Sequence, residues 1–178
     1  MAITRLGGAN AISGTIPQGN IANSSLGAVT ALPAAITTGK VLQVVTATDE
    51  TSRSTTSNTF VTASNTLTVN ITPSSTSNKI YVMANCGIHG STTTANAIST
   101  IYRDSTNLGN TAQAAGMAVC YSEVNADIGT SQAMSVLDSP NTTSQVTYQV
   151  YIRAGSGANC FINTFNEKGT ITAFEIAG

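Results

Sequence analysis

From Lys40 to the C-terminus, the chain is a succession of short segments in which apolar and polar residues alternate. The alternation is clearest at 66–72, where Leu67, Val69 and Ile71 occupy every second position. Because successive side chains of a strand point to opposite faces, alternation over about four to eight residues indicates a half-buried β-strand. Turn residues (Pro, Gly, Ser and Asn) separate the segments, and no amphipathic helical pattern lies between them. The pattern predicts an all-β fold of antiparallel strands.

The segments predicted to be strands occupy residues 40–47, 58–63, 66–72, 79–89, 96–104, 116–124, 131–138, 145–154, 160–165 and 170–177. Short strands at close spacing favour two packed sheets, so we expect an antiparallel, jelly-roll-like β-sandwich over residues 40–178, the head domain. The chain has no Trp and is only 5% aromatic. Its core must therefore consist mainly of Val, Ile, Leu, Ala and Thr. Such a core is lean, and self-association would bury further apolar surface.

Charged residues are scarce throughout the chain. They make up 8% of the 178 residues, whereas roughly 25% is typical, so Thr, Ser, Asn and Gly must supply the polar surface. The formal net charge is -1 and no segment concentrates basic residues, so we expect no nucleic-acid partner. The sequence has no run of about 18 apolar residues, and MAITRLGGAN lacks the apolar core of a signal peptide. We expect no membrane partner and a soluble chain made in the cytoplasm.

The cysteines are odd in number, and each lies in an apolar, strand-like segment. They are Cys86, Cys120 and Cys160, and no CxxC or Cys/His zinc spacing surrounds them. Isolated cysteines of this kind behave as small hydrophobic residues in a reducing compartment. The pattern predicts three buried free thiols.

Catalytic chemistry has few candidate residues. The single histidine, His89, follows a strand-like run in GIHG, which is more typical of a strand end than of a general base. We expect the scattered carboxylates on the solvated surface, although folding could pair two of them as in a glycosidase. They are Asp49, Glu50, Asp104, Glu123, Asp127, Asp138, Glu167 and Glu175. DSTN (104–107) has one acid where calcium loops have several, and a β-turn explains it. We expect no enzyme activity, catalytic residue, cofactor or metal.

Residues 1–39 differ from the rest of the chain. Glycines and prolines interrupt this segment too often for a long helix or strand, yet apolar residues recur every three to five positions. We interpret it as an extended N-terminal arm laid on a partner surface, with a wrap around its own domain as the alternative. The residues predicted to anchor the arm are Ile12, Ile16, Pro17, Ile21, Leu26, Val29, Leu32 and Pro33.

Three stretches resemble small structural proteins encoded by tailed phages, especially those of aquatic and cyanobacterial hosts. They are ISGTIPQGNIANSSLGAVTALPAAITTGKVLQVV (12–45), FVTASNTLTVNITPSSTSNKIYV (60–82) and the ending TITAFEIAG (170–178). Members of this group are labelled tail fibre or capsid cement proteins. The resemblance implies a β-sandwich head, frequently trimeric, on an N-terminal arm.

The resemblance and the pattern of the arm lead to two functional hypotheses. The first is a capsid decoration or cement protein, a homotrimer on the outer virion surface that binds the major capsid protein, and possibly other virion proteins, through its arms. The shortness of the chain favours it, because one sandwich and one arm leave no shaft. The alternative is a short tail fibre or receptor-binding protein recognising host surface glycans. Tyr102, Tyr121 and Tyr151 are its few aromatic candidates, although their strand positions favour core or subunit packing.

Overall fold

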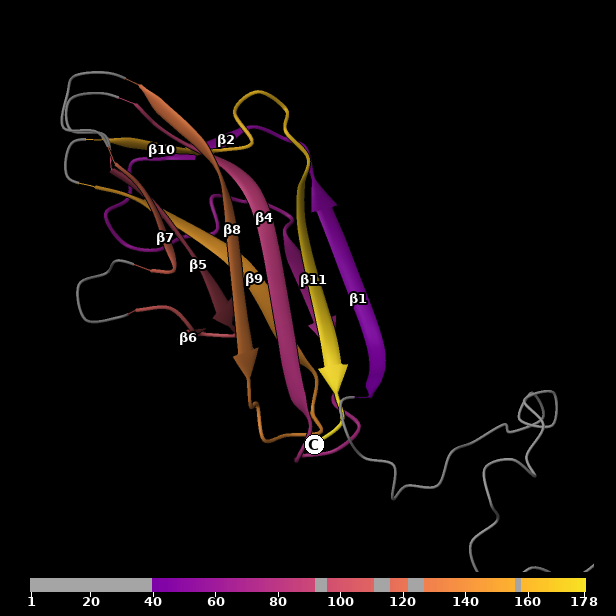
Figure 1. Ribbon diagram of the computed structural model, residues 1–178. Helices are drawn as coiled ribbons and strands as arrows, with labels where there is room; N and C mark the ends of the chain where they lie inside the picture. The colour runs from indigo at the N-terminus through magenta and orange to yellow at the C-terminus, as the bar shows by residue number, and fades with distance from the viewer. Residues whose placement is uncertain (1–39, 92–95, 111–115, 122–126, 156–157) are drawn as a thin grey trace, which may run out of the picture. The chain divides into compact units, whose positions relative to one another are not determined.

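The computed structural model describes residues 40–91, 96–110, 116–121, 127–155 and 158–178. These residues form strands and no helix, and hence no helix that could cross a membrane. The strands build two antiparallel sheets that pack face to face (Figure 1). The predicted all-β sandwich is confirmed, while its jelly-roll-like character stays a prediction. The predicted arm, residues 1–39, lies outside the described residues.

The larger sheet is organised around one long strand that has partners on both sides. Its strands are β1 (Val41–Asp49), β2 (Arg53–Thr55), β4 (Lys79–Ser91), β8 (Ile128–Asp138), β10 (Asn159–Ile162) and β11 (Gly169–Ile176). β8 runs along one side of β4, whereas β11 and then β10 share the other side. β1 pairs with β11 and β2 pairs with β10. The long strand β4 therefore lies in the middle of this sheet and pairs with strands on both of its sides.

The smaller sheet lies behind the larger one in Figure 1 and is centred on two strands. Its members are β3 (Thr68–Ile71), β5 (Asn96–Arg103), β6 (Thr106–Asn107), β7 (Ala118–Tyr121) and β9 (Val146–Ala154). β9 pairs with β3 and β5, and β5 also pairs with β6 and β7. Each pairing of strands is antiparallel, and in such a sheet one face can bury its side chains while the other face meets solvent.

The core fills the space between the two sheets. On β4, the residues that alternate inward include Ile80, Val82 and Cys86, which are buried, whereas Tyr81 and Met83 point outward. Most of the buried side chains are aliphatic, and Tyr148 is the large aromatic among them. The predicted lean aliphatic core is confirmed. The cysteine prediction is also confirmed, because all three thiols are free and buried.

One predicted strand is wrong, and two short strands were not predicted. Residues 58–63 form only an isolated bridge, between Val61 and Ile152. Just before them, the hydroxyl of Ser57 donates to the Thr59 carbonyl and accepts from the Thr59 amide. Ser and Thr side chains that bond to nearby backbone in this way compete with a sheet ladder. β2 and β6 were missed because three and two residues are too few to show an alternation.

Candidate functional site

The outer face of the larger sheet carries a row of four apolar side chains, one from each of four adjacent strands. Leu137 on β8 is opposite Tyr81 on β4, Tyr81 is opposite Phe174 on β11, and Phe174 is opposite Val44 on β1. Leu137 and Val44 are 55% and 54% exposed. The rings of Tyr81 and Phe174 lie 6.3 Å apart between centroids. We call these four residues the apolar row.

Further apolar and uncharged side chains extend the apolar row. Met83, two residues along β4, is 47% exposed and lines a shallow pocket of about 360 Å³ together with Phe174 and Thr172. Val41 and Leu42 add exposed apolar surface at the start of β1. On β4, the outward residues between Lys79 and His89 are uncharged, as are their outward partners on β8 and β11.

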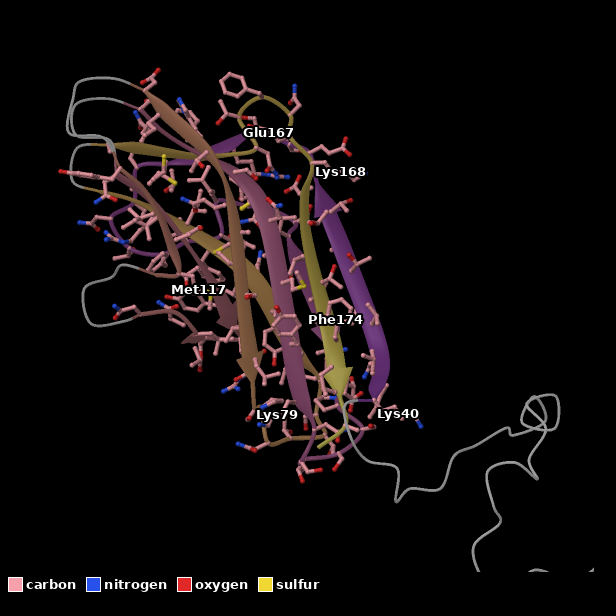
Figure 2. The ribbon with its side chains drawn as sticks, viewed as in Figure 1. Lys40, Lys79, Met117, Glu167, Lys168 and Phe174 are labelled. Carbon is pink, nitrogen blue, oxygen red and sulfur yellow. The ribbon has the colours of Figure 1, made fainter. Side chains whose placement is uncertain are left out.

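Charged side chains lie at the two ends of this sheet. Figure 2 shows Lys40 and Lys79 at one end and Glu167 and Lys168 at the other, with Phe174 between them along β11. Lys168 forms an exposed ion pair with Glu50, 3.1 Å between Nζ and Oε1. The middle of the face is thus neutral, and each end is charged.

A second pocket, of about 520 Å³, lies where β4 ends and β8 begins. It is lined by Ile88, His89, Asp127, Gly129, Thr130, Ser131, Phe165 and Glu167. The Phe165 side chain is 74% exposed, the most exposed large hydrophobic residue of the described chain. His89 lies near the end of β4, as predicted, with its ring 5.5 Å from that of Phe161 and 6.1 Å from that of Phe165. We call this the loop-end pocket.

Most residues that line the loop-end pocket are polar. His89 Nδ1 has no hydrogen-bond partner among the described residues. Glu167 Oε2 accepts a hydrogen bond from the amide of Phe165, 2.8 Å, and Oε1 lies beside Gly87. Ser131 Oγ donates to Asn85 Oδ1, 2.9 Å, at the edge of the pocket. The pocket therefore combines an exposed aromatic ring with carboxylate, hydroxyl and imidazole groups.

The expectation that the carboxylates lie on the solvated surface is wrong for three of them. Glu175 and Asp49 are 1% and 5% exposed, and the Asp138 side chain is only 10% exposed. Glu175 accepts hydrogen bonds from Gln43 Nε2 and Asn78 Nδ2, and from the amide and hydroxyl of Ser74. Burial alone would raise the pKa of Glu175, but these hydrogen bonds outweigh it and hold the pKa below its ordinary value.

The carboxylates of Asp49, which is buried, and Asp138, which is partly buried, are also held by internal donors. Burial would raise the pKa of Asp49, yet the amides of Thr66 and Thr51 and the guanidinium of Arg53 hold it below the ordinary value. Asp138 accepts from Arg103 Nη1, 2.8 and 2.7 Å to its two oxygens, and from the hydroxyl of Tyr148, 2.7 Å. These three acids link separate strands, which explains why they are inside.

The smaller sheet presents an aromatic cluster on its outer side. The rings of Tyr102 and Tyr151 stack at 4.0 Å, Phe60 meets Tyr102 edge-on at 6.1 Å, and the guanidinium of Arg153 lies 5.7 Å from the Phe60 centroid. The two tyrosines are half-buried against each other and outside the core. Tyr121 is 51% exposed on β7. The stacked rings of Tyr102 and Tyr151 cover part of each other's surface.

His89, Asp127 and Glu167 were singled out by sequence and line the loop-end pocket, but neither their meeting with Phe165 nor the apolar row was predicted. The predicted anchor residues of the arm, from Ile12 to Pro33, lie outside the described residues. In DSTN (104–107), Asp104 and Ser105 form the turn before β6, and Asp104, at a φ of 50°, accepts a hydrogen bond from the Thr147 amide. Across the described ranges, no three His, Cys, Asp or Glu side chains gather in a way that could hold a metal ion. No family model matches the chain, and no curated protein matches it significantly.

Proposed function

We propose that this protein is a non-enzymatic virion structural protein of a tailed bacteriophage. Its role is that of a capsid decoration protein, a homotrimer on the outer shell that binds the major capsid protein and stabilises it. The sequence resemblance of 12–45, 60–82 and 170–178 to such proteins supports the class. The N-terminal arm, residues 1–39, is the proposed attachment to the capsid.

The apolar row is the observation that carries the self-association in this proposal. Contiguous exposed apolar surface on a soluble protein is typical of an interaction site. The Thr, Ser and Asn side chains around the row can be buried at a lower desolvation cost than charged ones. Subunit interfaces have this anatomy, with an apolar centre that is depleted in charge and a polar rim. Here Lys40 and Lys79 would belong to the rim.

The positions of the buried carboxylates support a structural role. Asp49, Asp138 and Glu175 each accept hydrogen bonds from donors on neighbouring segments. A carboxylate saturated by internal donors is poorly suited to act as a general base or nucleophile. These three acids, which were among the candidates for a glycosidase pair, are thus engaged in hydrogen bonds that stabilise the fold.

A pair of matched substitutions tests the interface. Leu137→Glu places a charge in the apolar row, whereas Val119→Glu places one on β7 of the other sheet, and both side chains are 55% exposed. We expect Leu137→Glu to lower the molar mass measured by light scattering after size exclusion, because an unpaired carboxylate would be buried in the interface. Val119→Glu should keep the mass of the unmodified chain. Equal masses for both variants, with native circular dichroism, would exclude the apolar row as the interface.

The location on the virion is tested by copy number. Quantitative mass spectrometry of purified particles against the major capsid protein should give hundreds of copies for a decoration protein. A few to a few dozen copies would instead place the protein in the tail and make host recognition its role. Deletion of residues 1–36 should leave a folded chain that no longer joins particles. Particle binding by that truncated chain would remove the arm from the proposal.

A further inference from the structure

We propose that the loop-end pocket binds a neutral carbohydrate, with Phe165 as the stacking surface and Glu167, Asp127 and His89 as hydrogen-bonding groups. This inference goes beyond the proposed function and does not depend on the location of the protein in a virion. It rests on the geometry of the loop between β10 and β11, which Figure 2 marks by Glu167 and Lys168.

The Phe165 ring is presented to solvent by an ordered turn. Asn166 donates its amide to the Asn163 carbonyl, 3.0 Å, and Asn163 and Asn166 have φ values of 53° and 59°. The turn is tied to the sheets, because the amide of Asn163 bonds to the Gly87 carbonyl and its side chain to the Asp49 carbonyl. Because the backbone that carries the ring is ordered before binding, a ligand that covers the ring has less conformational entropy to overcome. The apolar C–H face of a pyranose ring suits such a surface.

The carboxylate of Glu167 is placed by the absence of a side chain at Gly87. A Cβ at Gly87 would come within 2.7 Å of both Cδ and Oε1 of Glu167. Glycine therefore lets the carboxylate lie against the outer face of β4, next to His89. One of its oxygens is used by the Phe165 amide, 2.8 Å, which leaves the carboxylate further accepting capacity for sugar hydroxyls.

The side chain of His89 also lines the loop-end pocket. Its Nδ1 atom is buried and has no exposed surface, so a ligand in the pocket would meet the ring at Nε2. A sugar hydroxyl can both donate and accept, so it can pair with this nitrogen in either tautomer.

The charge of the loop-end pocket selects the class of sugar. Asp127 and Glu167 line it, and the nearby Lys168 is paired with Glu50. Two carboxylates repel an anionic ligand, so sialic and uronic acids are disfavoured. The volume of about 520 Å³ is within the range of small-molecule pockets and leaves room for one or two sugar units.

The loop-end pocket is separated from the apolar row along the same strand. Tyr81 and His89 are eight residues apart on β4, 89 minus 81, which corresponds to about 26 Å at the usual rise of a strand. Subunits joined at the row would therefore leave the pocket accessible to a ligand. Binding and assembly can be tested separately for this reason.

Saturation-transfer NMR on the full chain tests the proposal. The probes are the methyl glycosides of glucose, galactose, mannose and N-acetylglucosamine at millimolar concentration, with N-acetylneuraminic acid as the anionic comparison. We expect transfer to the ring protons of at least one neutral glycoside and none to the anionic sugar. Phe165→Ala should abolish the transfer, and Glu167→Gln should weaken binding about tenfold or more, as expected for a lost charge-assisted hydrogen bond.

The matched control is Tyr121→Ala, which removes another aromatic side chain, 51% exposed on β7, that does not line the loop-end pocket. Its transfer should equal that of the unmodified chain. Phe165 is 74% exposed, so its truncation should leave the fold intact, which circular dichroism verifies. Transfer from no neutral glycoside, or equal transfer in Phe165→Ala and Tyr121→Ala, would overturn the proposal. The light-scattering result for Leu137→Glu is independent of either outcome.

Discussion

Replacing Glu175 with Gln tests whether its buried carboxylate holds together the end of the sandwich where residues 72–78 connect β3 to β4. Oε1 accepts three hydrogen bonds, from the amide of Ser74 at 2.6 Å, its hydroxyl at 2.8 Å and Asn78 Nδ2 at 2.6 Å. Oε2 accepts from Gln43 Nε2 at 2.8 Å. The carboxylate thus connects β1, β11 and the connection from β3 to β4.

The size of the effect follows from these contacts. In Glu175→Gln, the amide oxygen can keep the three bonds at the Oε1 position, but they lose the assistance of the charge. The amide nitrogen then faces Gln43 Nε2, donor against donor. Gln43 also donates to the Thr72 carbonyl, 2.8 Å. Rotating the Gln43 amide by half a turn would therefore place its oxygen against the Thr72 carbonyl oxygen, and one unfavourable contact would remain. We expect the free energy of unfolding at pH 7 to fall by about 2–4 kcal/mol.

Lowering the pH should reduce the difference in unfolding free energy between the unmodified chain and Glu175→Gln. The pKa of Glu175 in the folded chain lies below its ordinary value of 4.5, because the hydrogen bonds outweigh burial. The ionised carboxylate therefore stabilises the fold above the ordinary value, and this contribution is lost as the pH falls through the lower folded pKa. The gap in stability between the unmodified chain and Glu175→Gln should be full at pH 7 and should narrow below pH 4.5.

Urea unfolding followed by far-ultraviolet circular dichroism measures both effects. Glu50→Gln is the matched control, because Glu50 forms an ion pair with Lys168 in which both side chains are about 60% exposed. Such a surface pair contributes little, so its loss should change stability by less than about 0.5 kcal/mol. Similar small losses for Glu175→Gln and Glu50→Gln at pH 7 would refute the reasoning.

Two further predictions follow from buried polar and thiol groups. Tyr148→Phe should lower the free energy of unfolding by about 1.5–3 kcal/mol in the same urea assay, because a fully buried hydroxyl donates to the Asp138 carboxylate; an unchanged midpoint would contradict this. Burial raises the pKa of the Cys86 and Cys160 thiols to about 12, so none of the three thiols should react with Ellman's reagent at pH 8 until urea unfolds the chain. Fast reaction of the folded chain would show an accessible thiol.

Several of the few charged side chains of this chain are carboxylates that stabilise the fold. Asp138 bridges the two sheets, since it lies on β8 and accepts from Arg103 on β5 and Tyr148 on β9. A charge-assisted hydrogen bond inside a protein is stronger than a neutral one. A lean aliphatic core can therefore be complemented by a few buried, fully bonded acids. The middle of the outer face of the larger sheet carries no charged side chain on β4 or on its outward partners on β8 and β11.

The alternation of residues determined much of the fold by itself. Leu67, Val69 and Ile71 fall on one face by sequence, and all three are buried. The same local rule predicted the buried cysteines. A strand buries the side chains of one face wherever two sheets pack, so this information is present within each short segment.

Only the tertiary structure decided the roles of the acids and of Phe165. Glu175 is buried because Ser74 and Asn78, 101 and 97 residues away along the chain, meet it with donors. Phe165 became part of a pocket because the turn that carries it packs beside His89, a residue from another strand. Burial of a charge and the composition of a pocket depend on groups that are distant in sequence, and a local sequence pattern cannot predict which of these groups come into contact.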